Sequence, residues 1–285
     1  MGLAVVFAVT VRVRLREMPL ERDEGEYAYA GQLILQGVPP YKEAYNMKLP
    51  GTYAAYAMIM AVFGQTPSGI RLGLALVNAA AIVLMFRLGR RLLDEAAGVT
   101  AAVAFALLSL SPSLLGLSGH ATHFVVLAAL AGTWFLLKAV EAPSAVRSPP
   151  SRFTFLTSRF THSGDGTQLS PINYPLLLAG LMFGLAFLMK QHGLFFGVFG
   201  GLYLLWVRGG EVLLAAGDNS QPAGNRSQRA QGGLQFWSPA SRAAWGRLVR
   251  DLGWFGLGGL LPYGATCLVL WWAGVLPQFL SLIHI

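Results

Sequence analysis

The segment Arg22 to Gly51, RDEGEYAYAGQLILQGVPPYKEAYNMKLPG, gathers charged and phenolic side chains inside an otherwise apolar sequence. A carboxylate within hydrogen-bond reach of a hydroxyl can take its proton, and a lysine can bind a phosphate. Asp23, Glu24 and Lys48 are therefore candidates for acid-base and phosphate chemistry. Two structural alternatives stay open. The acids also suit the first turn of an amphipathic helix, where the helix dipole stabilises them, and Lys48 suits snorkelling to lipid headgroups.

Two further polar groups stand between apolar runs. His120 and His123 lie three apart in GHATHF and could share one side of a helical turn as a metal-binding pair. Only distant carboxylates accompany them, which leaves such a site incomplete, so we expect no metal. Lys190 and Gln191 belong to KQHG. A charge there is costly unless it pairs or lines a cavity; a phosphate would be one partner, and snorkelling is the structural alternative.

The composition is that of an integral membrane protein, with 54% apolar and only 12% charged residues over 285 positions. The net charge of +8 does not indicate nucleic-acid binding. The basic residues are scattered between apolar runs, without a basic helix or an aromatic stacking platform. The single cysteine, Cys267, excludes an internal disulfide and a cysteine-rich metal site.

The apolar pattern predicts an all-α, polytopic membrane protein, because six runs are long enough to cross roughly 30 Å of hydrocarbon. They are Ile70 to Phe86, Ala96 to Leu117, Phe124 to Val140, Pro175 to Met189, Leu194 to Val207 and Leu252 to Trp272.

Two shorter apolar runs are interpreted separately. Met1 to Val11 is expected to be a first transmembrane helix whose true start lies upstream; a signal peptide is less favoured because no basic region precedes the run and no clear cleavage site follows it. Thr52 to Phe63 is shorter than the roughly 17 residues that a span needs. We expect it to lie along the membrane surface, where Tyr53 and Tyr56 suit the headgroup level.

Two polar inserts, residues 141–173 and 208–250, are rich in Ser, Pro, Gly, Gln and Arg. Such segments cannot bury enough apolar surface to fold, so we expect disordered loops. Within the intervening runs, glycines recur four apart, which predicts close helix packing in lipid rather than a phosphate loop. These glycines are Gly180, Gly184, Gly193, Gly197 and Gly201.

The distribution of Lys and Arg predicts the orientation, because cytoplasmic loops carry an excess of both. If each long run crosses once, residues 15–69 form a first outer loop, and Ser118 to Phe124 and Lys190 to Gly193 are outer turns. Thirteen of the 21 Lys and Arg residues then share the opposite, cytoplasmic face. They are Arg87, Arg90, Arg91, Lys138, Arg147, Arg152, Arg159, Arg208, Arg226, Arg229, Arg242, Arg247 and Arg250.

The order of these features resembles the membrane glycosyltransferases of the GT-C fold. It consists of a first helix, an outer loop with RDEGEYAYAGQLILQGVPPY and NMKLPG, a short apolar segment ending in FG, and a helix closing with RLGRRL. The sequence is most similar to the bacterial family 39 group, which includes protein O-mannosyltransferases and the lipid A aminoarabinose transferase. The resemblance covers about Glu21 to Leu205 and is most specific in Asp23 to Gly51.

The resemblance implies a GT-C helix bundle in which amphipathic interfacial helices lie in the first outer loop. Such enzymes pass a sugar from a polyprenyl-phosphate carrier to an acceptor hydroxyl outside the membrane, with inversion at the anomeric carbon. By resemblance, Asp23 is the general base, Glu24 its hydrogen-bond partner or a substrate contact, and Lys48 the phosphate ligand. The remaining candidate substrate contacts are Tyr27, His120, His123, Lys190 and Gln191. Relatives often carry an acid where this chain has the two histidines, which is a departure from the pattern.

The resemblance further implies a single GT-C domain over residues 1–285 in the bacterial inner membrane, with its active site facing the periplasm or the cell exterior. The expected partners are a polyprenyl-phosphate hexose or pentose, a lipid, glycan or protein acceptor, and membrane lipids, with no cofactor and no nucleic acid. Two alternatives stay open. One is a non-enzymatic transporter, and the other is an inactive fragment, because relatives usually continue through further helices after the position of VLPQFLSLIHI.

Overall fold

The computed structural model describes residues 1–44, 47–141, 173–217 and 238–283, and every regular element in these ranges is helical. The prediction of an all-α membrane protein is therefore confirmed. The elements are α1 (Gly2–Arg14), α2 (Arg22–Leu35), α3 (Gly51–Phe63), α4 (Pro67–Leu92), α5 (Glu95–Leu108), η1 (Pro112–Leu114), α6 (Ala121–Glu141), α7 (Tyr174–Met189), η2 (Gln191–Gly193), α8 (Leu194–Gly217), α9 (Pro239–Trp272) and α10 (Leu276–Ile283).

Four of the described stretches are long and apolar enough to cross a membrane: Pro67–Leu92, Ala121–Glu141, Gln191–Ala216 and Pro239–Trp272. The other two expected crossings form the shorter apolar helices α5 and α7. Helix α5 ends at Leu108, nine residues before the predicted end of its run. Pro112 accounts for this early end, because the residue before a proline is held out of the helical region, and Ser111 is extended at φ −68°, ψ 123°.

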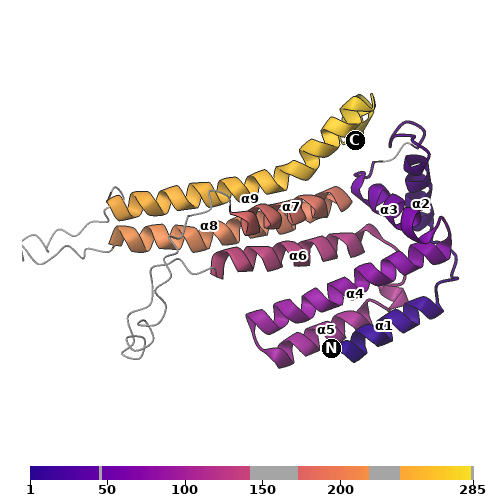
Figure 1. Ribbon diagram of the computed structural model, residues 1–285, viewed down its shortest axis with the longest axis horizontal. Helices are drawn as coiled ribbons and strands as arrows, with labels where there is room; N and C mark the ends of the chain where they lie inside the picture. Colours follow the sequence, from indigo (N-terminus) through magenta and orange to yellow (C-terminus); the bar gives the residue numbers. More distant parts are fainter. Residues whose placement is uncertain (45–46, 142–172, 218–237, 284–285) are drawn as a thin grey trace, which may run out of the picture.

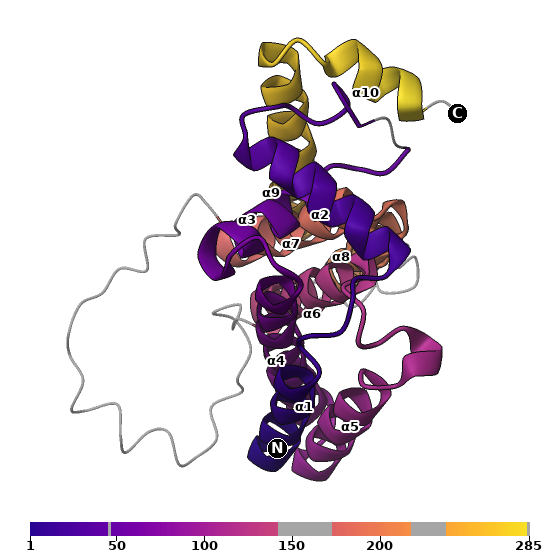
Figure 2. The ribbon, with the colours of Figure 1, turned by 90° about the vertical axis from the view of Figure 1, so that its right-hand side faces the viewer.

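The long helices run roughly side by side, and α2 and α3 form a cap across one end of the bundle (Figures 1 and 2). The turn between α5 and α6 and the C-terminal end of α9 lie at this capped end, whereas the turn between α4 and α5 lies at the opposite end. Helices α6, α8 and α9 all meet the undescribed segments at that opposite end. The two predicted polar inserts therefore border the same end of the bundle.

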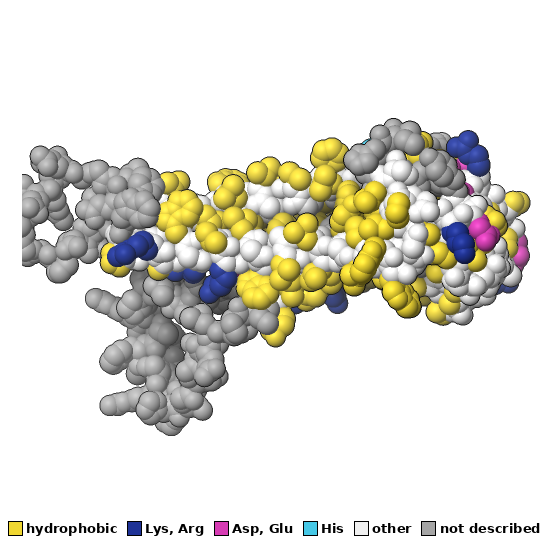
Figure 3. All heavy atoms as spheres, turned by 90° about the horizontal axis from the view of Figure 1, so that it is seen from above, with side chains coloured by type: hydrophobic (Ala, Val, Ile, Leu, Met, Phe, Trp, Pro, Cys, Tyr) yellow, Lys and Arg dark blue, Asp and Glu magenta, His cyan; other side chains and the backbone are white. Residues whose placement is uncertain are grey.

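The surface between the two ends is largely apolar. On the face that Figure 3 shows, hydrophobic side chains cover the middle of the bundle, and the visible acidic side chains gather at the capped end. Large apolar side chains of α8 and α9 are widely exposed, including Phe199 (69%), Trp206 (78%) and Trp272 (88%). Apolar exposure of this extent suits contact with lipid and would be a liability in water.

The prediction of a disordered loop over residues 208–250 is wrong at both ends of that range. Helix α8 continues to Gly217 and α9 begins at Pro239, so only residues 218–237 of that loop lie outside the described residues. The helices persist because their polar side chains find partners. Arg208 Nε donates to Asp251 Oδ2 at 2.9 Å, and Asp251 is only 1% exposed. Ser238 caps α9 by accepting from the Ser241 amide at 3.1 Å. Of the loop 141–173, residues 142–172 lie outside the described residues.

Helices α7 and α9 approach each other through small residues. A Cβ atom added to Gly180 would overlap the carbonyl oxygen of Phe255 and would stand 2.8 Å from the Gly259 amide nitrogen. Gly258 of α9 likewise packs against the backbone of Leu177. A Cβ on Gly184 would likewise overlap the Gly259 carbonyl oxygen, so the prediction of close helix packing is confirmed at Gly180 and Gly184. It is wrong at Gly197 and Gly201, where an added Cβ would make only ordinary contacts at 3.6 Å. The spacing in α7 did not predict the facing glycines of α9.

We expect Gly180→Ala to lower the midpoint of thermal unfolding by several degrees, because the added methyl group forces α7 and α9 apart; overpacking of this kind costs about 1–3 kcal/mol. Gly256→Ala is the matched control in α9, since a Cβ there meets nothing within 4 Å. Unfolding of the detergent-purified chain, followed by tryptophan fluorescence, measures both. Equal midpoints for the two variants would contradict close packing at Gly180.

Candidate functional site

The acidic end of α2 is a capping box. The Glu21 side chain accepts from the Asp23 amide at 2.9 Å, and the Glu24 side chain accepts from the Glu21 amide at 2.9 Å. These bonds satisfy amides that a helix N-terminus otherwise leaves without a partner. Both Asp23 and Glu24 lie in the first turn, as the structural alternative expected. Glu24 also completes the cap begun by Glu21, whereas the Asp23 carboxylate takes no part in it.

Glu24 is fully buried and bound on several sides. Arg71 of α4 donates from Nη2 to Glu24 Oε2 at 2.8 Å and from Nη1 to Oε1, and the Gly119 amide donates to the same carboxylate. Arg71 also donates to the carbonyl oxygens of Leu117 (2.6 Å) and Pro19 (3.1 Å). Glu24 is 0% exposed and Arg71 5%. Glu24 thus joins α2 to α4 and to the 117–119 turn, and a substrate reaches it only if this network opens.

Arg71 was absent from the candidates drawn from the sequence because it lies in an apolar run. Its position could have identified it, because an ionisable residue inside a candidate membrane span is expected to have a partner and a role.

Asp23 keeps a partly open carboxylate, with its side chain 24% exposed. Its Oδ1 lies 3.6 Å from Lys48 Nζ and 3.6 Å from Arg22 Nη2, and its Oδ2 lies 3.9 Å from His120 Nδ1. The distances are those of ion pairs rather than of tight hydrogen bonds, so the carboxylate oxygens remain available to a further donor.

Lys48 reaches the same place from the segment before α3. Its Nζ donates to Glu26 Oε2 at 2.9 Å and lies 4.6 Å from the ring centroid of Tyr27. Burial alone would lower the pKa of Lys48, but the hydrogen bond to Glu26 and the neighbouring Tyr27, Glu26 and Asp23 outweigh it and raise the pKa above its usual value. Lys48 therefore stays a cation. Burial likewise raises the pKa of Tyr27, which stays a neutral phenol.

Glu26 is a second residue of the cluster that the sequence did not reveal. Besides Lys48, it accepts from the Tyr53 hydroxyl of α3 at 3.3 Å. It stands three residues after Asp23, so both carboxylates lie on one side of α2. This helical spacing was the signal that could have identified it.

The segment that carries Lys48 is held by Tyr41. The Tyr41 hydroxyl donates to the Lys48 carbonyl at 2.9 Å, and the ring packs on Phe279 of α10 at a centroid distance of 5.5 Å. Tyr41 has φ +70°, which is uncommon and strained for a bulky residue. Its side chain is 5% exposed. Such strain persists where the surrounding contacts fix the backbone, so the Lys48 segment has a defined place against α10.

The two histidines separate. His120 lies beside the acids of α2, with Nε2 3.7 Å from Glu21 Oε2. Its Nε2 is buried and makes no hydrogen bond within the described residues. His123 lies near the backbone of Gly116 and Ser118 instead. Among the described residues, Glu21, Asp23 and His120 place ligand atoms within 4.8 Å of one another, a spacing that a metal ion could bridge. His123 is not part of this group, so the structure does not form the histidine pair considered from the sequence.

Lys190 and Gln191 lie at the turn between α7 and α8, at the same end of the bundle as the cap. This turn is fixed to the start of α3, because the Thr52 hydroxyl donates to the Met189 carbonyl at 2.8 Å. Both side chains are exposed. In the part of the chain that the structure describes, Lys190 makes no ion pair with the acids of α2, and Gln191 makes no hydrogen bond to them. The structure thus brings together Asp23, Lys48, Tyr27 and His120 and leaves Lys190 and Gln191 at the edge.

Comparison with known families gives one match. Residues 48–147 match the model of a family described as dolichyl-phosphate-mannose-protein mannosyltransferase, which confirms the resemblance to GT-C glycosyltransferases over that range. The matched range contains Lys48, Arg71 and His120. No curated protein and no solved structure matched the chain in the corresponding comparisons. At a general level, the match supports a multi-pass membrane glycosyltransferase with a polyprenyl-phosphate-linked sugar donor.

We expect Glu24→Gln to destabilise the fold strongly. The substitution leaves the Arg71 guanidinium buried without its counter-charge, and breaking a buried pair in this way costs about 3–5 kcal/mol. Thermal unfolding of the purified chain measures the loss. The double variant Glu24→Leu, Arg71→Leu should recover part of it, because neither charge of this pair is then left buried without its partner.

Asp23→Asn is the adjacent control. Its carboxylate is partly exposed and lies outside the cap, so its unfolding midpoint should stay close to that of the wild type. If Glu24→Gln unfolds at the wild-type midpoint, Glu24 does not hold the cap to α4.

Proposed function

We propose that this protein is an inverting glycosyltransferase that moves a sugar from a polyprenyl-phosphate carrier to a hydroxyl of a lipid, glycan or protein at the outer face of the membrane. The observation that carries the proposal is the pairing of Asp23 and Lys48. A partly open carboxylate and a cation from separate segments of the chain lie 3.6 Å apart, at the capped end of an apolar bundle. Proton removal and phosphate binding thereby share one small region.

Each residue then has a chemical task. The acceptor oxygen attacks the anomeric carbon of the sugar and forms the new glycosidic bond. The bond from that carbon to the carrier phosphate breaks, and its electron pair leaves with the phosphate oxygen. Asp23 takes the hydroxyl proton as general base. Lys48 stabilises the charge that develops on the departing phosphate. One displacement at the anomeric carbon inverts its configuration.

The contacts of Lys48 indicate how the carrier phosphate would bind. The Lys48 ammonium group already donates to Glu26 at 2.9 Å. An arriving phosphate would therefore share the ammonium group with that carboxylate or displace it. Tyr27, under the ammonium group, and His120, beside Asp23, stand where they would contact the sugar or the phosphate. Lys190 and Gln191 would contact a part of the carrier farther from the reacting phosphate, or the acceptor, since their turn borders the start of α3.

We place the chain in the bacterial inner membrane, with the cap facing the periplasm or the cell exterior. The opposite end carries basic residues of α4, α6, α8 and α9, and such residues are favoured on the cytoplasmic side. Helices α2 and α3 would then lie at the outer headgroup level, where the Asp23 cluster can meet both a membrane-bound carrier and an acceptor outside the hydrocarbon.

Asp23→Asn tests the chemistry. It keeps the size of the side chain and removes the proton acceptor, so turnover should fall by roughly 100-fold or more, with carrier binding little changed. The assay incubates the membrane-embedded chain with candidate polyprenyl-phosphate hexoses and pentoses, and mass spectrometry detects the added sugar on lipids, glycans and proteins. Lys48→Met is the comparison. It should weaken both carrier binding and turnover, because the phosphate is charged before and during the reaction. Near wild-type turnover in a folded Asp23→Asn variant would exclude Asp23 as the base.

Cysteine labelling tests the orientation. In a Cys267→Ser background, a cysteine at Gln36 should react with a membrane-impermeant maleimide in intact cells, because Gln36 is exposed at the end of α2. A cysteine at Leu93, which is 77% exposed between α4 and α5, should react only after the cells are permeabilised. The reverse pattern would put the cap in the cytoplasm.

A further inference from the structure

Arg12 of α1 is a buried cation that the proposed reaction does not use. It is 4% exposed, and its Nη2 donates to the carbonyl oxygens of Ser109 (2.6 Å) and Gly116 (2.8 Å). Its Nε is buried and has no hydrogen-bond partner within the described residues. No carboxylate of those residues forms an ion pair with it, whereas the positive charge of Arg71 is balanced by Glu24.

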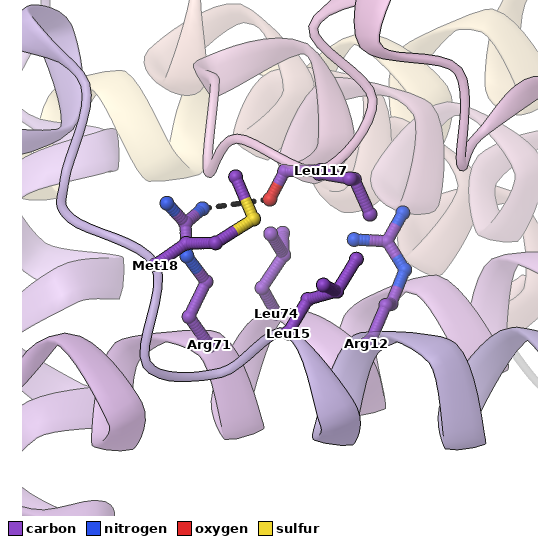
Figure 4. Close-up of a pocket in the computed structure, with 6 residues that line it drawn as sticks. All are labelled: Arg12, Leu15, Met18, Arg71, Leu74 and Leu117. Atoms are coloured by element: carbon purple, nitrogen blue, oxygen red, sulfur yellow. Dashed lines mark hydrogen bonds between the residues drawn. The ribbon is translucent and has the colours of Figure 1, made fainter.

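The two arginines line one small cavity, together with Leu15, Met18, Leu74 and Leu117 (Figure 4). Figure 4 shows the two guanidinium groups on opposite sides of it, with the leucines between them. The cavity has a volume of about 10 Å³, close to the minimum that holds one water-sized group. The Nε of Arg71, like that of Arg12, is buried without a partner among the described residues.

The charges around the cavity determine what it favours. Two guanidinium groups and one carboxylate leave an excess of one positive charge, and a buried charge without a counter-ion is destabilising. A cation would raise this cost. A neutral water would satisfy a donor but would leave the charge in place. A small anion would satisfy a donor and also neutralise the excess charge.

We infer that this cavity binds one compact anionic group, either a free halide ion or a single phosphate oxygen of a lipid headgroup. The two sources share the same chemistry, which is one anionic atom that accepts from a buried guanidinium. The volume admits a single such atom and not a whole phosphate. Leu15 and Met18 line the cavity and are 36% and 39% exposed, so an apolar surface suited to lipid adjoins it. This site is separate from sugar transfer and does not depend on the proposed function.

The experiment follows thermal unfolding of the full chain in an uncharged detergent. The sample starts in halide-free sodium gluconate, and chloride replaces gluconate at constant ionic strength. A second arm adds inorganic phosphate, and a third compares micelles that contain phosphatidylglycerol with micelles that contain diacylglycerol. A ligand that binds only the folded state raises the midpoint, and the rise grows with the ratio of its concentration to Kd. We expect a rise of several degrees in the chloride arm or in the phosphatidylglycerol arm.

Three variants locate the response. Arg12→Gln should abolish the rise, and Arg14→Gln, an equal charge change on the exposed side of the same helix, should keep it. Because Arg12 also holds two carbonyl groups, Leu74→Phe is added; its ring occupies the cavity while Arg12 remains, so the rise should shrink. A rise with chloride identifies a free ion as the source, and a rise with phosphatidylglycerol alone identifies a lipid. No rise in any arm of the wild type, or an equal rise in Arg12→Gln, overturns the inference.

Discussion

The ion pair between Glu24 and Arg71 is the contact on which the capped end of the molecule depends. Glu24 belongs to the first turn of α2 and Arg71 to α4, and both are buried. The carboxylate also accepts from the Gly119 amide, so the two charges fix α2, α4 and the turn before α6 against one another. Removal of two charges from water is costly unless geometry and hydrogen bonds compensate. Here four further hydrogen bonds surround the pair: two amides donate to Glu24, and Arg71 donates to two carbonyl oxygens. Together they fix the three elements in one arrangement.

Adjacent acids in α2 have different surroundings because successive residues of a helix point about 100° apart. Glu24 faces the bundle, where its carboxylate is bound by Arg71 and by the helix cap. Asp23 faces the Lys48 segment, and its carboxylate stays partly exposed. The resemblance assigned the two acids different chemical roles, but only the packing of α2 on α4 shows that one is buried and the other partly open. The buried acid thus gives the open acid a fixed backbone, and that is the requirement for a base that must lie within hydrogen-bond distance of an acceptor.

The sequence predicted the parts of the fold that depend on local patterns. Apolar runs located α4 and α6, glycine spacing indicated the α7 surface, and acids marked the start of α2. The wrong end of α5 arose from a local signal, Pro112, whereas the other errors arose where contacts with distant residues determine the structure. Residues 208–217 and 239–250 were assigned to one loop with the Ser-, Gly-, Gln- and Arg-rich stretch between them. Both are helical, and the pair Arg208 and Asp251 stabilises the α8–α9 contact. Tyr41 could not be identified as a support of Lys48 either, because its strained backbone and its contact with Phe279 are visible only after α10 has packed.

The charges around Lys48 constrain how a phosphate could be used at this site. Asp23 and Glu26 both lie within 3.6 Å of the ammonium group. A phosphate that simply approached this cluster would face two carboxylates for one lysine. If the phosphate takes the place of Glu26, Lys48 keeps a compensating anion throughout, and the Glu26 carboxylate remains bonded to the Tyr53 hydroxyl. Glu26 would thereby act as an internal counter-ion that keeps the lysine charged and positioned while the site is empty, and the carrier phosphate would take over that role when it binds.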